Sequence, residues 1–185
     1  MGGKPTWLAL FTVGHSTRSL DELTALLHEH GVTLLADVRT APGSRRMPHF
    51  TKAALAASLP ARGIRYAHLP ELGGLRRPRP DSPNTGWRNE RFRGYADHMA
   101  DADFGAGLDR LVAWGRDRAV AIMCAEAVPW RCHRSLIADA LLVRGEGVVH
   151  IIGPGRAQAA SLTPFARVEG GRITYPGQFQ GRFPL

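Results

Sequence analysis

Five short apolar runs separated by helical segments constrain the fold of this 185-residue chain more than any other feature. The runs are expected to be buried strands, and they occupy residues 8–13, 33–38, 64–69, 119–122 and 148–152. Strands that alternate with helices predict a mainly parallel sheet with helices on both faces. We therefore expect a single α/β domain with about five strands, of the Rossmann or flavodoxin-like type.

The helical segments between these runs have recognisable ends. Ser19, followed three residues later by Glu22, predicts a capping box, and Gly31 ends that helix. Thr51 is expected to cap an alanine-rich helix that stops at residues 62–63. Two more helices are expected at 91–100 and 104–118, and a last one runs to residue 144.

The C-terminal part has a different pattern from the α/β part. Gly170 and Gly171 lie between two short segments, 166–169 and 172–175, which is typical of a β-hairpin with a two-residue turn. We expect an α/β domain over residues 1–152 and a tail over 153–185 that packs on the same domain.

Composition limits the classes of function. No run reaches the roughly 18–20 apolar residues of a membrane span, and the N-terminus lacks a signal-peptide pattern, so a cytoplasmic protein without membrane contact is expected. Two cysteines make no disulfide framework. The net charge is +8, and 22 of the 24 basic residues are arginine, which favours an anionic partner: a small molecule or a nucleic acid.

The segment 123–134, MCAEAVPWRCHR, concentrates reactive side chains between the fourth strand and the following helix. Pro129 suits the first turn of a helix, and we expect Cys132, His133 and Arg134 in that turn. A helix N-terminus lowers the pKa of a thiol, which favours Cys132 over Cys124 as a nucleophile. The angular position of His133 predicts that it faces the sheet, where it acts as an acid or base or is a core histidine.

In open parallel sheets, ligands bind at the carboxyl ends of the strands. The loops expected there, 39–50, 69–93 and 124–134, hold 11 of the 22 arginines. The expected catalytic residues are His133, Glu126, Cys132, Cys124 and Asp37. The expected substrate-binding residues are His15, Ser16, Arg39, Ser44, Arg45, Gly73, Gly74, Arg93, Tyr95, Arg131 and Arg134.

Several motifs in this order resemble the DUF488 family, a family of unknown function. They are Gly14-His15-Ser16, Asp37-Val38-Arg39 with Pro42 and Ser44-Arg45, Leu72-Gly73-Gly74, Phe92-Arg93-Gly94-Tyr95, and Cys124-Ala125-Glu126 with 129–134. The match spans roughly residues 15–152, and the tail lies outside it. The resemblance implies a cytoplasmic prokaryotic protein and brings no established reaction.

Structural explanations compete with each functional one. Asp37 and Glu126 form an acid/base or ribose-binding pair, or they pair with Arg39 and Arg134. The position of the arginine after Cys124 does not fit the loop of cysteine phosphatases. No metal is expected, because neighbouring residues on a helix, such as Cys132 and His133, point about 100° apart.

Three functions remain open from the sequence. The first is an enzyme that acts on a phosphorylated or nucleotide-like substrate at the carboxyl edge of the sheet. The second is a nucleic-acid-binding protein without catalysis, motivated by the arginine-rich loops, although no known nucleic-acid-binding motif is present. The third is a nucleotide-sensing module in which the buried cysteines and His133 are structural.

Overall fold

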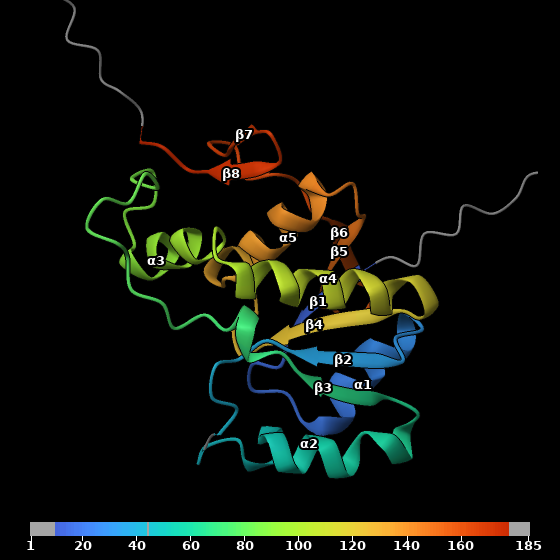
Figure 1. Ribbon diagram of the computed structural model, residues 1–185. Coiled ribbons are helices and arrows are strands. Elements are labelled where there is room, and N and C mark those ends of the chain that lie inside the picture. The colour runs from blue at the N-terminus through green and yellow to red at the C-terminus, as the bar shows by residue number, and fades with distance from the viewer. Residues whose placement is uncertain (1–9, 44, 178–185) are drawn as a thin grey trace, which may run out of the picture.

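A six-stranded sheet in the order β3-β2-β4-β1-β5-β6 forms the centre of the computed structural model (Figure 1), which describes residues 10–43 and 45–177. Five strands are parallel, and they are β1 (Leu10–Gly14), β2 (Leu34–Asp37), β3 (Arg65–His68), β4 (Val120–Cys124) and β5 (Val148–Gly153). The expected α/β fold is confirmed. Residues 8 and 9 of the first expected strand, Ser44, and residues 178–185 of the tail lie outside the described residues.

The sixth strand, β6 (Arg156–Ala159), is antiparallel to β5 and was not predicted. Its four residues are all exposed and polar or small, so it has no hydrophobic pattern. By contrast, every residue of β2 and β4 is buried, because helices cover both faces of these central strands.

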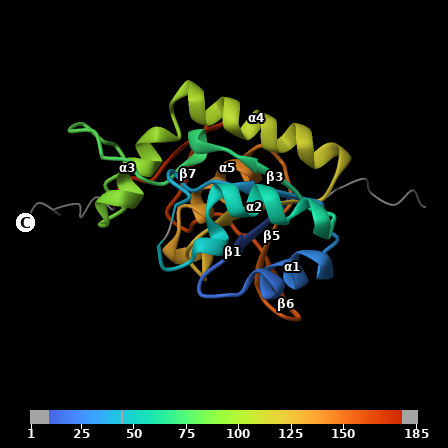
Figure 2. The same ribbon diagram turned by 90° about the horizontal axis from the view of Figure 1, so that it is seen from below.

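The helices lie on the two faces of the sheet according to the direction of their crossover. The connections from β1 to β2 to β3 carry α1 (Leu20–Glu29) and α2 (Lys52–Ser58) on one face. Those from β3 to β4 to β5 run the opposite way along the sheet and carry α3 (Glu90–His98), α4 (Ala102–Asp117) and α5 (Arg134–Val143) on the other. Right-handed crossovers require this segregation, and Figure 2 shows α4 and α1 on opposite sides.

The opposed crossovers leave an opening at the carboxyl ends of the central strands. The chain leaves β1 and β2 toward the face of α1 and α2, whereas it leaves β4, which lies between them, toward the face of α5. Loops that part in this way create the usual ligand-binding crevice of open α/β sheets. The fold therefore places the segment after β4 beside this opening.

The start of α5 differs from the prediction in a way that matters for the site. Pro129–Arg131 form a separate 3-10 turn, and α5 begins only at Arg134. Cys132 between them is extended, with φ −136° and ψ 145°. The expectation that Cys132 lies within the first helical turn is therefore wrong, although the capping box at Ser19 is confirmed.

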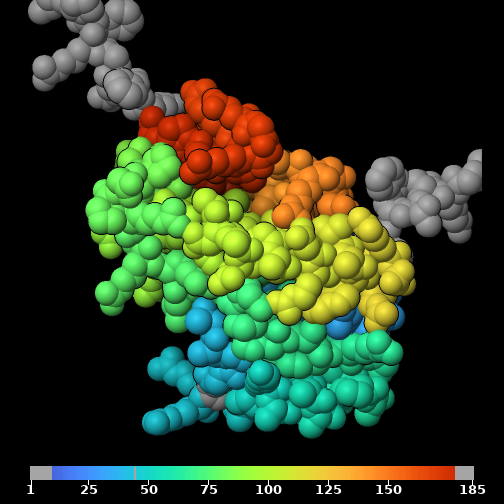
Figure 3. Space-filling view, in the orientation of Figure 1, coloured from blue at the N-terminus to red at the C-terminus, as the bar shows by residue number. Residues whose placement is uncertain are grey.

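The tail forms the expected hairpin, β7 (Arg167–Glu169) and β8 (Arg172–Thr174), outside the main sheet. It packs beside the long loop before α3, as the red and green surfaces in Figure 3 show. Tyr175 is fully buried there, and Asn84 and Gly86 bond to its backbone. None of the described helices has the length and hydropathy needed to span a membrane.

Candidate functional site

A pocket of about 350 Å³ opens at the carboxyl ends of β2 and β4. Four segments line it: the loop after β2, the loop after β3, the start of α3 and the loop after β4. Its lining residues are Arg39, Thr40, Ala41, Gly74, Leu75, Asn89, Arg91, Phe92, Cys124, Ala125, Glu126, Arg131, Cys132 and His133. Its volume suits a small molecule.

Both cysteines and one histidine meet on the wall of this pocket. The Sγ atoms of Cys124 and Cys132 lie 3.9 and 3.7 Å from Nδ1 of His133. All three side-chain atoms fall within 4.8 Å of one another. The extended backbone at Cys132 turns its sulfur toward β4, so the side chains of Cys132 and His133 lie side by side although the two residues are neighbours in sequence.

The ring of His133 is held from several sides. Its Nε2 lies 3.2 Å from the carbonyl oxygen of Val38, and because a carbonyl only accepts, Nε2 carries the hydrogen. Nδ1 is then left to face the two sulfurs. Tyr95 packs against the ring at 4.9 Å, and a Cβ added to Gly74 would lie 2.4 Å from Nδ1, so only glycine fits there.

The environment shifts the pKa values of the two thiols in opposite directions. A hydrogen bond from Cys124 and the positive charge of Arg134, opposed by burial, lower the pKa of Cys132 well below its usual range. The same hydrogen bond, together with burial, raises the pKa of Cys124. Cys132 is therefore the more acidic of the two thiols.

Arg134 explains why a charged sulfur is tolerated. Its side chain is fully buried, and among the described residues no carboxylate forms an ion pair with it. Its backbone N–H and Nε instead point at Cys132 Sγ, at 3.5 and 3.4 Å. An unpaired buried guanidinium is costly, so the Cys132 thiolate is its natural counter-charge.

The rest of the Arg134 guanidinium is fixed by neutral oxygens. One nitrogen donates to the carbonyl of Glu126 at 2.6 Å and another to Thr12 Oγ1 at 3.3 Å. Thr12 in turn lies 2.7 Å from Nδ1 of His150. Burial and the charge of Arg134 lower the pKa of His150 to about 4, so His150 is neutral and accepts the Thr12 proton.

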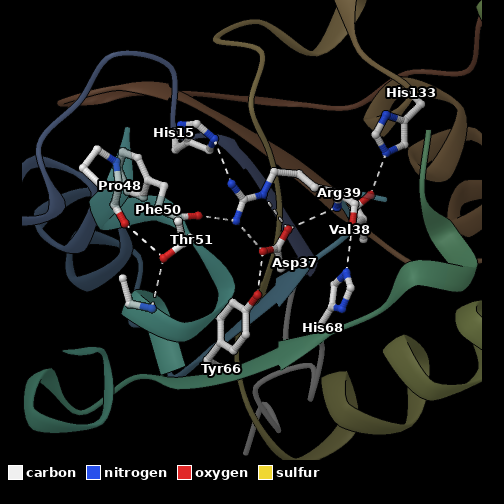
Figure 4. A network of polar contacts seen from close by, with 11 residues as sticks. His15, Asp37, Val38, Arg39, Pro48, Phe50, Thr51, Tyr66, His68 and His133 are labelled. Carbon is white, nitrogen blue, oxygen red and sulfur yellow. Dashed lines mark hydrogen bonds and ion pairs between the residues drawn. The ribbon is translucent and has the colours of Figure 1, made fainter. Parts of the chain in front are cut away.

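A second network supports the loop after β2 (Figure 4). Arg39 binds both oxygens of Asp37, at 2.8 and 2.5 Å, and also the carbonyl of Phe50. Tyr66 donates to the same carboxylate at 2.7 Å, which with burial raises the pKa of Tyr66. The ion pair that was the structural alternative for Asp37 is therefore present, whereas Glu126 contacts Arg134 only through its backbone oxygen.

The loop after β1 contacts the cysteine loop through its backbone. His15 and Ser16 donate to the carbonyls of Cys124 and Ala125, at 3.0 and 2.9 Å. A Cβ on Gly14 would lie 1.8 Å from the carbonyl oxygen of Glu126, so the backbones of the two loops are in direct contact. The side chain of His15 stacks on Phe50, and burial lowers the pKa of His15 to about 4.

The predicted residues separate into two groups. Those that line the pocket are Cys124, Glu126, Cys132, His133, Arg39, Gly74 and Arg131. Those that lie behind it or beside it are Asp37, His15, Ser16, Arg45, Gly73, Arg93, Tyr95 and Arg134. Ser44 lies outside the described residues.

Seven of the lining residues were not among the predicted site residues: Thr40, Ala41, Leu75, Asn89, Arg91, Phe92 and Ala125. Arg91 was counted among the loop arginines but not singled out. Asn89 is the N-cap of α3, a pattern that would have marked the helix start. Phe92 and Ala125 belong to motifs that carry the family resemblance. No pattern in the sequence marks Thr40, Ala41 or Leu75.

The chain is thus an α/β protein with a cysteine–histidine cluster in an arginine-lined pocket at its strand ends. Residues 19–141 match the family described as "Domain of unknown function DUF488", a range that contains β2, β3, β4 and both cysteines. The chain belongs to the DUF488 family. The comparisons with curated proteins and with solved structures gave no match.

Proposed function

We propose that this protein is an enzyme that acts on a phosphorylated or nucleotide-like anionic small molecule bound in the pocket. The observation that carries the proposal is that the reactive cluster and the arginine rim share one cavity. Cys124, Cys132 and His133 form the reacting part, and Arg91 and Arg131 are the anion-binding part.

The charge around the pocket supports an anionic ligand. Arg91 and Arg131 are exposed and line the opening, whereas Glu126 is the one carboxylate among the lining residues. The charge of Arg39 is already balanced by Asp37, so this arginine adds shape and hydrogen-bonding capacity more than charge. We therefore assign the substrate's anionic group to Arg91 and Arg131.

The groups behind the pocket support the same proposal in another way. Asp37 does not line the cavity, and its carboxylate is occupied by Arg39 and Tyr66. We assign it a positioning role. Glu126, which is exposed at the rim, is the carboxylate that can exchange protons with a bound substrate.

The pocket size separates this function from nucleic-acid binding. A volume of about 350 Å³ encloses a small metabolite or a single nucleotide. In addition, five of the eleven loop arginines bond to the protein itself, namely Arg39, Arg76, Arg79, Arg93 and Arg134. The net charge of +8 therefore overstates the positive charge that is free to bind a nucleic acid.

The proposal can be tested with two alkylating reagents that differ in charge. Iodoacetate is an anion and iodoacetamide is neutral, and both alkylate thiolates. With a chelator present, the pocket cysteines should prefer iodoacetate more strongly than free cysteine does. Peptide mapping should place the adduct on Cys124 or Cys132.

Arg131→Gln should reduce the preference for iodoacetate about fivefold, because one charge about 8 Å away at an effective dielectric constant of about 40 contributes about 1 kcal/mol. Arg116→Gln is the matched control, since Arg116 is exposed on α4 and does not line the pocket. An iodoacetate preference equal to that of free cysteine, or lost equally in both variants, would exclude an anion-binding pocket.

A further inference from the structure

The cluster of Cys124, Cys132 and His133 has the composition and spacing of a metal site. For a tetrahedral zinc ion with typical bond lengths, the sulfur–nitrogen edge is about 3.6 Å and the sulfur–sulfur edge about 3.8 Å. The two sulfur–nitrogen distances are 3.9 and 3.7 Å, and all three atoms lie within 4.8 Å of one another. An ion would require shifts of only a few tenths of an ångström along the two sulfur–nitrogen edges, and of at most about 1 Å along the sulfur–sulfur edge.

The orientation of the histidine also fits a ligand. Metal-binding histidines usually donate their second ring nitrogen to a carbonyl or carboxylate, which fixes the lone pair on the metal side. Nε2 of His133 lies 3.2 Å from Val38 O, and Nδ1 faces the sulfurs. The backbone of Gly74 and the ring of Tyr95 hold the imidazole in this orientation.

The charge of the cluster suits a soft divalent cation. A zinc ion with two thiolates is neutral, and the nearby Arg134 already stabilises charge on the sulfur of Cys132 through two N–H groups. Neighbouring residues on a helix point about 100° apart, which would keep Cys132 and His133 from sharing an ion. Cys132 is instead extended and α5 begins only at Arg134, so this restriction does not apply.

We propose that Cys124, Cys132 and His133 bind one zinc-like divalent ion, with the fourth position open to the pocket. Three protein ligands with an open position are typical of catalytic zinc sites, whereas structural sites use four. All three residues line the pocket, so water or the anionic group of a ligand can complete the coordination. This site does not depend on the substrate proposed above.

Cobalt(II) is the probe of choice, because it replaces zinc and reports its ligands by absorption. Titration of the chelator-treated, reduced protein should reach a plateau at one cobalt per chain. It should produce a sulfur-to-cobalt charge-transfer band and the intense visible bands of tetrahedral cobalt. One equivalent of zinc should then abolish both bands.

Variants separate this site from adventitious binding. Cys124→Ser and Cys132→Ser should each weaken the charge-transfer band, and they and His133→Gln should lower cobalt affinity about a hundredfold or more. His28→Gln is the control, because His28 is an exposed histidine of α1. Circular dichroism shows which variants remain folded, and Cys124→Ser leaves the sulfur contacts of Arg134 intact.

The absence of a charge-transfer band in the wild-type protein, or a band unchanged in folded Cys124→Ser and His133→Gln proteins, would overturn the metal site. Neither result changes the alkylation preference, which is measured with a chelator present. Conversely, cobalt binding with the expected bands stands even where iodoacetate shows no preference. The two proposals therefore fail separately.

Discussion

Arg134 shows how a single residue can determine the chemistry around it. The guanidinium is fully buried, and its hydrogen bonds go to a sulfur and to neutral oxygens. The positive charge of Arg134 helps to lower the pKa values of both Cys132 and His150. The sequence predicted Arg134 as an anion ligand, and in the structure its guanidinium contacts a sulfur of the protein itself.

His150 gives a pH prediction at this scale. In the unfolded chain its pKa is about 6.5, whereas burial lowers the folded value to about 4. Below pH 6.5 the unfolded chain therefore binds a proton that the folded protein does not. The contribution of His150 to the free energy of unfolding is therefore fully present above pH 6.5 and is lost as the pH falls toward 4.

His150→Asn keeps a hydrogen-bond acceptor for Thr12 and removes this titration. The melting temperature of the variant should fall by several degrees less than that of the wild-type protein between about pH 7 and pH 5. His15 titrates in the same range, so part of the fall remains. An equal fall in both proteins, with His28→Asn as the exposed control, would contradict this assignment.

At the scale of elements, the long loop before α3 depends on one carboxylate. Asp97 of α3 is 4% exposed and accepts hydrogen bonds from Arg79 N at 2.8 Å, Ser82 Oγ at 2.6 Å and Asn84 Nδ2 at 2.7 Å. A segment of this length, with only one short 3-10 turn of its own (Pro70–Leu72), needs such anchors. The same loop carries Gly74 and Leu75 to the pocket.

Asp97→Ala should destabilise the protein by about 2–4 kcal/mol, because three donors lose their acceptor. Trypsin should then cut first in the loop, after Arg76 or Arg88, faster than it cuts the wild-type protein, because Arg77 and Arg79 precede prolines and resist cleavage. Asp109→Ala removes an exposed partner of Arg144 and should cost less than about 1 kcal/mol. Loop cleavage at the wild-type rate in Asp97→Ala would show that the loop is held elsewhere.

The elements also show what sequence could and could not predict. Buried parallel strands are continuous apolar runs, so β1 to β5 were found, and the Gly170-Gly171 turn identified the hairpin. The edge strand β6 consists of exposed residues and pairs only through its backbone, so no hydrophobic pattern marks it. The start of α5 was misplaced because Pro129 suits a 3-10 turn as well as a helix.

The site was predicted in its composition but not in its geometry. Cys124, His133 and Arg131 could be placed at one edge of the sheet because carboxyl ends of parallel strands meet there. The sequence did not reveal that both sulfurs lie beside Nδ1 of His133, since this depends on the extended backbone of one residue, Cys132. Nor could it tell paired arginines from free ones, because pairing depends on tertiary contacts.

At the scale of the whole molecule, the described part of the tail, residues 153–177, contributes to the folded core. Tyr175 is fully buried, donates to Asp139 at 2.7 Å and lies against Trp87, whose ring also contacts Phe92 in the pocket wall. The expected division at residue 152 therefore separates regions of sequence that share one hydrophobic cluster. We expect the described chain to unfold as one unit.

Tyr175→Ala should lower the free energy of unfolding by about 3–5 kcal/mol, since it empties a large buried site. Val168→Ala, on the exposed part of the hairpin, should change it by less than about 0.5 kcal/mol. Chemical denaturation followed by both far-ultraviolet dichroism and tryptophan fluorescence should give coincident single transitions. Two separate transitions in the wild-type protein would mean that the tail folds independently.

The hydrogen bond between His133 and the carbonyl of Val38 limits which mutations can disturb the orientation of the imidazole. A main-chain oxygen is present whatever amino acid is encoded at position 38, so no codon change there deletes the acceptor. On the Val38 side, the contact is disturbed by mutations that move the backbone, such as changes at Asp37 or Arg39. Apolar replacements that fit the core at position 38 would thus leave the direction of the imidazole unchanged.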